Sequence, residues 1–319
     1  MIISSRNHVS EPCNHVMRRG DLHARSSHWR TTLIASVAIT AIVFASPCLS
    51  EAAVPVTSGL LVHLAADDVD DNTGTAPAAG AVGTWANLAP AVTSIGNFSP
   101  GGSADVVLNV LNGNTKPVVR FDGSDFFNNN TAAVGNTAGA ELTIFAVSKS
   151  SASNGVIVSN RGFSPEGNGE GGFHIRYNTV TNPDYLHLGT GGGGVNATVT
   201  DQFNILETTR GPTDVLTLSV NGGTPASVDV DYNSVTASLS TNVGASFYNG
   251  NAVNALVGDI AEVLIYDSVL SASELNQVGF FLEDKYGLNT AYVPEPCTGV
   301  LVALGLLCLG CVRWRTRDQ

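Results

Sequence analysis

The densest group of oxygen ligands in the sequence follows the first apolar segment of the central region. Five carboxylate or amide side chains lie close together, namely Asp67, Asp68, Asp70, Asp71 and Asn72. Calcium binds about six to eight oxygen atoms from such side chains and from backbone carbonyls. We therefore predict a calcium site in this loop, outside the core. A solvated acidic loop is the alternative, and calcium is the only cofactor that the sequence suggests.

A second oxygen-rich stretch has the same two interpretations. It contains Asp122, Asp125, Asn128, Asn129 and Asn130. Polar side chains of this kind also bind sugars when an aromatic ring lies beside them. Three aromatic residues could supply that ring or lie in the core instead: Phe126, Phe127 and Tyr185. Three histidines fall within alternating apolar segments, where a core or surface position is the simpler interpretation: His63, His174 and His187.

The sequence lacks the paired carboxylates that would cleave a glycosidic bond. Glycoside hydrolases hold two carboxylates roughly 5–9.5 Å apart across that bond, so a strand would need acidic residues at i and i+2 or i+4. The nearest arrangement is Asp229-Val230-Asp231, which has turn-like flanks and no glutamate beside it. No Ser-His-Asp order and no His-x-x-x-His spacing occur. We therefore predict no catalytic residue and no enzymatic activity.

The charge of the central region excludes one class of partner. Between Ala52 and Cys297 there are seven basic and 23 acidic residues, a formal charge of −16. Such a surface repels the phosphate backbone of nucleic acids, whereas cations, neutral polysaccharide or a basic protein stay compatible with it. All five cysteines lie in the two ends of the chain, and none lies in the central residues 54–292: Cys13, Cys48, Cys297, Cys308 and Cys311. The central region must therefore fold without disulfides.

The N-terminal residues 1–53 are typical of a secretory signal peptide. Basic residues up to Arg30 precede an apolar run from Thr31 to Ala45, and small residues follow. That order predicts cleavage after Ala52 or Ala53 by the export machinery. Because the basic stretch is long, Met17 is a possible true start.

The C-terminal residues 293–319 combine three features in one order. Pro294, Glu295 and Pro296 are followed by an apolar run from Cys297 to Val312, and then by Arg313, Arg315 and Arg317. As a helix the run would span ~24 Å, short of the ~30 Å hydrocarbon core, so a short membrane anchor is one interpretation. The segment resembles the PEP-CTERM sorting signal. That resemblance implies a bacterial host, an exosortase-type membrane protease, and release to the cell envelope or extracellular matrix.

The basic residues flank both apolar runs on their outer sides. The positive-inside rule then places both termini in the cytoplasm and the central region across the membrane. We therefore expect membrane contact only through the terminal segments, with transient anchoring by the C-terminal helix.

The central residues 54–292 read as one all-β domain. Short alternating apolar segments predict strands at residues 60–64, 118–121, 142–147, 155–158, 173–177 and 215–220. Asn221-Gly222-Gly223 predicts a hairpin after the last of these. A single helix is predicted where Ser271 and Glu274 form a capping box, and Gly287 should end it. Strands this short and regularly spaced favour a sandwich or barrel.

Four segments resemble bacterial concanavalin A-like, laminin-G-like domains. They are residues 59–67 with Trp85 and Asn87, residues 116–123, residues 142–145, and the closing stretch 258–271 with Glu274 and 285–288. The resemblance implies a jelly roll of two antiparallel sheets with one short C-terminal helix. It implies no single activity, because that fold carries lectins, glycosidases and adhesion modules.

From these observations we predict an exported, non-catalytic interaction module that binds carbohydrate or extracellular matrix. Two alternatives stay open at this point, a divergent glycoside hydrolase and a purely structural envelope protein.

Overall fold

The computed structural model describes residues 53–72, 77–108, 111, 116–137, 139–160, 172–187, 193–230, 240–248 and 251–294. The predicted signal peptide, apart from Ala53, and the predicted sorting tail beyond Pro294 lie outside these ranges. Among the described helices, none combines the length and the apolar character that a membrane crossing requires.

The larger sheet has nine antiparallel strands in the described chain. Its order is β14-β13-β12-β7-β18-β5-β4-β2, and β1 pairs with β18. The strands are β1 (Leu60–Ala65), β2 (Gly80–Ala81), β4 (Asp105–Leu108), β5 (Pro117–Asp122), β7 (Leu142–Ser150), β12 (Asn204–Arg210), β13 (Val215–Val220), β14 (Ala226–Asp229) and β18 (Val257–Tyr266).

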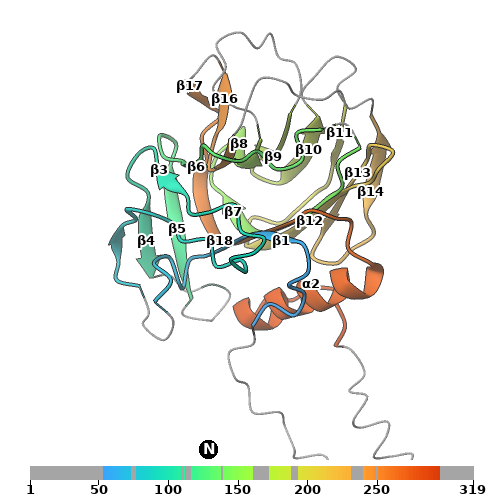
Figure 1. Ribbon diagram of the computed structural model, residues 1–319, viewed down its shortest axis with the longest axis horizontal. Coiled ribbons are helices and arrows are strands. Elements are labelled where there is room, and N and C mark those ends of the chain that lie inside the picture. Colours follow the sequence, from blue (N-terminus) through green and yellow to red (C-terminus); the bar gives the residue numbers. More distant parts are fainter. Residues whose placement is uncertain are drawn as a thin grey trace, which may run out of the picture. The chain divides into compact units, whose positions relative to one another are not determined.

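The smaller sheet has seven described strands in the order β11-β10-β9-β8-β15-β6-β3. They are β3 (Ser99–Pro100), β6 (Phe127–Asn129), β8 (Gly155–Ser159), β9 (Phe173–Thr179), β10 (Asn182–His187), β11 (Gly194–Asn196) and β15 (Thr241–Val243). A separate hairpin pairs β16 (Ser246–Tyr248) with β17 (Asn251–Val253). Within the described ranges, the predicted all-β class with two large antiparallel sheets and one helix near the C-terminal end is confirmed, and the arrangement is consistent with a jelly roll (Figure 1).

The six predicted strands correspond to β1, β5, β7, β8, β9 and β13. The predicted hairpin also forms, because β13 pairs antiparallel with β14. Asn221 and Gly222 adopt positive φ angles of 52° and 69° there, a backbone region that Asn and Gly tolerate better than other residues. Local sequence therefore determines this turn.

The central strands of the nine-stranded sheet, β7, β12 and β18, are buried on both faces. Val263 and Ile265 of β18 point into the core between the two sheets, whereas Leu264 and Tyr266 belong to a second apolar cluster. That second cluster contains Val278, Leu282 and Tyr286 of the helix α2 (Ala272–Tyr286). Successive side chains of a strand point to opposite faces, so one strand contributes to both cores.

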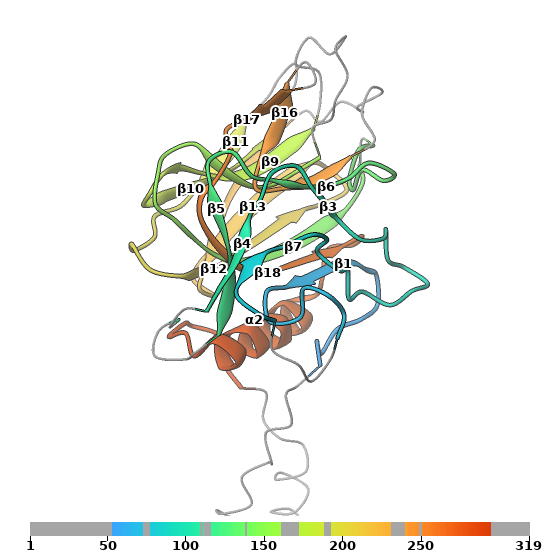
Figure 2. The ribbon, with the colours of Figure 1, turned by 90° about the vertical axis from the view of Figure 1, so that its left-hand side faces the viewer.

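The helix α2 begins and ends as its sequence predicts. The Ser271 hydroxyl accepts from the Glu274 backbone N–H at 3.4 Å, and the Glu274 carboxylate accepts from the Ser271 backbone N–H at 2.8 Å. Gly287 follows the helix with a φ of 61°, the left-handed conformation that closes many helices. The helix covers the outer face of the nine-stranded sheet (Figure 2).

After α2 the chain folds back over the helix. We call residues 288–293 the C-terminal strap. Tyr292 is buried in the strap, and its hydroxyl donates to Glu207 Oε2 at 2.8 Å. Val54 and Val56, at the other end of the described chain, lie in the same apolar cluster as Tyr292. Both ends of the described chain therefore leave from the α2 side (Figures 1 and 2).

The close approach of the strap to α2 yields a test of this packing. A Cβ atom added to Gly279 would lie 2.1 Å from Cε1 of the Tyr292 ring. Overpacking of this kind costs roughly 1–3 kcal/mol, more than the helical preference of alanine returns. We expect Gly279→Ala to lower the midpoint of urea unfolding. Gly83→Ala is the matched control, because nothing lies within 4 Å of its added Cβ. Equal midpoints for both variants would contradict the packing.

Candidate functional site

A β-bulge in β18 turns a carboxylate toward the helix. The pairing of β18 with β7 shifts register between Ile260 and Glu262, so Ala261 is the extra residue. Ile260 and Val263 lie in the core between the sheets, while Ala261 lies in the helix-side cluster. A bulge places two consecutive residues on one face of a sheet. Glu262 consequently points toward α2.

Glu262 is fully buried and is held by three partners. Its carboxylate lies 2.8 Å from Lys285 Nζ and 2.9 Å from His63 Nε2, and it accepts from the Tyr286 hydroxyl at 2.6 Å. Burial alone would raise the pKa of this carboxyl, but Lys285 and His63 outweigh that effect and lower the pKa to about 2. Glu262 is therefore ionised at every ordinary pH.

Lys285 connects this carboxylate to the predicted calcium loop. Burial would lower the pKa of Lys285, but Glu262 and Asp67 together raise it. The Asp67 carboxylate lies 3.0 Å from Lys285 Nζ and 3.7 Å from Lys116 Nζ. The predicted calcium loop is therefore joined to the buried charges through Asp67. Asp67 places a second negative charge beside the buried ammonium of Lys285.

The remaining members of the loop do not form a metal cage. Asp68 Oδ1 accepts from the Asn72 backbone N–H at 2.8 Å. Burial, together with repulsion from Asp71, Asp70 and Asp67, raises the pKa of Asp68. Across the described ranges, no group of three or more His, Cys, Asp or Glu side chains is arranged to hold a metal ion. The five side chains thus do not converge on a preformed calcium site, and calcium binding stays a prediction.

The second oxygen-rich stretch uses its polar side chains to hold its own turn and two loops that precede it in the sequence. Asp125 accepts from the backbone N–H groups of Ser103 at 2.8 Å and Asp122 at 3.2 Å. The Asn129 amide donates to the carbonyl of Ile95 at 2.7 Å. These bonds join loops that are distant in sequence. A structural role therefore accounts for Asp125 and Asn129.

A cavity of about 510 Å³ lies beside the buried charges. His63, Asp67, Asp68, Asp71 and Lys285 contribute its polar wall, and Phe281 is among its apolar lining residues. Three of the polar residues already bind one another through the Glu262 and Lys285 contacts described above. The cavity wall is consequently part of the structural charge network.

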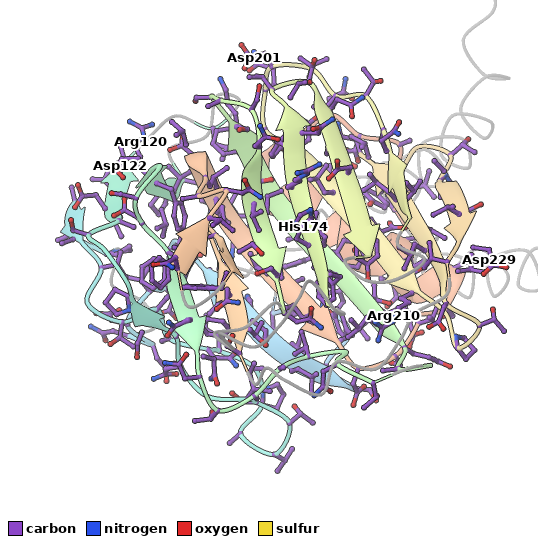
Figure 3. The ribbon with its side chains drawn as sticks, turned by 90° about the horizontal axis from the view of Figure 1, so that it is seen from above. Arg120, Asp122, His174, Asp201, Arg210 and Asp229 are labelled. Carbon is purple, nitrogen blue, oxygen red and sulfur yellow. The ribbon has the colours of Figure 1, made fainter. Side chains whose placement is uncertain are left out.

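The outer face of the seven-stranded sheet carries a different arrangement. Asn128 pairs in register with Asn242, Asn242 with Ser159, and Ser159 with His174. These four residues, which we call the polar row, cross β6, β15, β8 and β9 at one level, and all are buried. The core neighbours Phe127, Val243 and Val158 point the opposite way. His174 lies near the middle of this face (Figure 3).

Arg176, two residues after His174 on β9, forms an ion pair with Asp184 of β10 on the same face of the sheet. Arg176 Nε donates to Asp184 Oδ1 at 3.0 Å, and Nη2 donates to Oδ2 at 3.1 Å. Burial raises the pKa of Asp184, and Arg176 counters only part of that effect. Asn178 follows as an exposed residue, and its Oδ1 lies 3.5 Å from Arg176 Nη2. The polar side chains on this face of β9 thus become more exposed from His174 to Asn178.

The sequence did not identify Arg176, Asp184 and Asn178 as site residues. The available signal was the alternation of β9, in which His174, Arg176 and Asn178 oppose the core residues Phe173, Ile175 and Tyr177.

Of the aromatic candidates, Phe127 and Tyr185 are core residues. Phe126 is half-buried and packs edge-on against Phe247, with ring centroids 4.9 Å apart. Asp229 is exposed on β14, and Asp231 lies outside the described residues.

Comparison with known proteins finds likenesses in structure only. No protein-family model matches the sequence, and no curated protein matches it. A sialidase CBM40 domain from Ruminococcus gnavus, bound to α2,3-sialyllactose, is 19% identical with a TM-score of 0.38, over 43% of this chain and 80% of that chain. Domain 4 of a GH43 extracellular arabinanase from Geobacillus stearothermophilus, in complex with arabinotriose, is 11% identical with a TM-score of 0.47, over 70% and 100%.

A third similar structure is of botulinum neurotoxin type C, whose cell entry depends on interaction with two ganglioside molecules. It is 11% identical with a TM-score of 0.47, over 70% of this chain and 51% of that chain. At these low identities and TM-scores, none of the three likenesses assigns a ligand to this chain.

Replacing Glu262 tests the buried charge network. Glu262→Gln should lower the free energy of unfolding at neutral pH by roughly 3–5 kcal/mol, because Lys285 loses its buried counter-charge. The folded pKa of about 2 lies below the ordinary 4.5. The stabilisation is therefore complete above pH 4.5 and is lost as pH falls toward 2. The difference from wild type should shrink over that window in urea titrations.

A second variant separates charge from shape in the same network. Glu262→Gln combined with Lys285→Met removes both charges, and should recover part of the lost stability. If the double variant loses as much stability as Glu262→Gln and Lys285→Met lose in sum, the two side chains do not interact, and the network is contradicted.

Replacing Asp67 distinguishes its two roles. As a partner of Lys285, Asp67→Asn should lower the melting temperature, at a cost of roughly 1–3 kcal/mol for a charged hydrogen bond. Asp71→Asn, at an exposed position with a positive φ of 57° that asparagine also tolerates, is the control. Melting would be followed in calcium and in chelator. A calcium-dependent rise in wild type that Asp67→Asn abolishes would instead support the calcium prediction.

Proposed function

We propose that this chain is an exported, non-catalytic module that binds a neutral polysaccharide outside the cell through the outer face of its seven-stranded sheet. The observation that carries the proposal is the ion pair of Arg176 and Asp184, next to the exposed Asn178. Together these side chains offer charge-assisted donors, acceptors and an amide in a fixed arrangement, which suits the vicinal hydroxyls of a sugar.

Electrostatics favours an uncharged ligand. The Arg176–Asp184 pair is neutral as a whole, and the polar row beside it is buried. The central region as a whole has a formal charge of −16, which disfavours acidic polymers. Asp184 and Arg176 are both largely buried, with 7% and 18% of their side chains exposed. Their positions are therefore fixed before a ligand arrives, which limits the entropy lost on binding.

The geometry of the buried carboxylates supports a non-catalytic role over a divergent glycoside hydrolase. Glu262 and Asp67 both bind Lys285 Nζ, at 2.8 and 3.0 Å, so these two carboxylates are neighbours, as a glycoside hydrolase would require of its pair. However, Glu262 has no exposed side-chain surface. With a pKa of about 2 it cannot protonate a leaving group.

Export is supported by the two terminal segments. The signal-like run of residues 31–45 and the resemblance of residues 293–319 to a PEP-CTERM signal both point to passage across a membrane. Processing by an exosortase-type protease and residence in the cell envelope or matrix are part of this proposal. The described residues contain no cysteine, so their stability does not depend on the redox state of that compartment.

Affinity measurements on the full chain in mild detergent test the ligand. On an array of neutral and acidic polysaccharides we expect retention by neutral ones. Arg176→Ala should weaken that binding by about tenfold or more, since a hydrogen bond to a charged group contributes about 1.5–3 kcal/mol. Arg120→Ala is the control, because Arg120 forms the same two-bond pair with Asp259 on the nine-stranded sheet.

Three outcomes separate the alternatives. Equal weakening by both arginine variants would refute the assigned face. Release of reducing sugar ends from a bound polysaccharide would indicate a glycoside hydrolase. Failure to bind any polysaccharide would favour a structural envelope protein.

A further inference from the structure

The C-terminal strap is docked on the domain as far as Val293, the residue before the Pro-Glu-Pro motif. The Asn276 side chain of α2 clamps Val293 from both sides: Asn276 Nδ2 donates to the Val293 carbonyl at 2.7 Å, and Asn276 Oδ1 accepts from the Val293 N–H at 3.0 Å. One residue earlier, Tyr292 is buried against Gly279 and bonded to Glu207. The chain therefore leaves the domain at a fixed point on the α2 side.

Very little chain separates that point from the apolar run. Only Pro294, Glu295 and Pro296 stand between Val293 and Cys297, where the run begins. An extended chain spans at most ~3.6 Å per residue, so Val293 lies within roughly 14 Å of Cys297. If residues 297–312 insert into a bilayer, this short connection keeps the α2 side of the domain close to the headgroups.

The surface of α2 suits contact with lipid headgroups. Leu275, Phe280 and Phe281 are half-buried on the helix, and Val293 beside it is 62% exposed. Half-exposed aromatic and aliphatic groups of this kind favour the boundary between headgroups and acyl chains. The charges of the helix select among lipids, because Glu274, Glu283 and Asp284 outnumber Lys285 and would be repelled by anionic headgroups.

We propose that the surface formed by α2 and the C-terminal strap rests on a zwitterionic lipid bilayer in which residues 297–312 are embedded. This inference concerns the chain before its sorting tail is processed, so it rests on the export step of the proposed function but not on the identity of the ligand. The strap sets the orientation of the domain. Arg176 and the exposed Asn178 belong to the other sheet, across the sandwich from α2, so they face away from the lipid.

Fluorescence quenching tests this orientation in the full chain. Its five cysteines are replaced by alanine, and one cysteine is introduced at Asp284→Cys on α2 or at Asn178→Cys on β9, both exposed positions. Each variant is labelled with a small fluorophore and reconstituted into phosphatidylcholine nanodiscs that contain lipid with a nitroxide on its headgroup. We expect the label on α2 to be quenched several-fold more strongly than the label on β9. Adding phosphatidylglycerol should reduce the quenching on α2.

A strap variant supplies the control. In the Asp284→Cys background, Asn276→Ala should lower the quenching because it frees the strap and lengthens the tether, whereas Gln277→Ala at the next, half-buried position should not. Thermal melts identify variants that fail to fold. Equal quenching at both labelled sites, or failure of the chain to co-elute with the nanodiscs, would overturn the proposal. Loss of polysaccharide binding in Arg176→Ala with unchanged quenching would leave it standing.

Discussion

The burial of one carboxylate constrains the whole helix side of this protein. Glu262 has no exposed side-chain surface, and an unpaired charge in such a position would cost several kcal/mol. Its partners come from β1 and from the end of α2, so the charge is compensated only when the helix is docked. Lys285 also pairs with Asp67 from the loop after β1. The contacts of these charges therefore join β18 and α2 to β1 and its following loop, which lie far from them in the sequence.

This arrangement divides the sandwich into two faces with different properties. The outer face of the nine-stranded sheet is covered by α2, and both ends of the described chain lie in its apolar cluster. The outer face of the seven-stranded sheet instead carries the polar row and the Arg176–Asp184 pair. The proposed tether and the proposed ligand therefore lie on opposite faces, and neither would disturb the core between the sheets.

The acidic loop shows why residue type alone is a weak guide to a site. Five oxygen-bearing side chains are compatible with calcium, with solvent or with a basic partner, and composition does not distinguish among them. The structure assigns Asp67 to Lys285, which follows it by more than two hundred positions in the chain. Carboxylates near a lysine have their charge compensated without a metal ion.

The sequence by itself determined the features that depend on neighbouring residues. The strands predicted at 60–64, 142–147 and 215–220, the turn at Asn221, and the capped helix ending at Gly287 all follow from local periodicity, positive-φ preference and capping. Only the tertiary structure decided the rest. The bulge at Ala261 reverses the face that simple alternation would give Glu262. The polar row exists because four strands pair in one register, and pairing between distant strands depends on how the whole core packs.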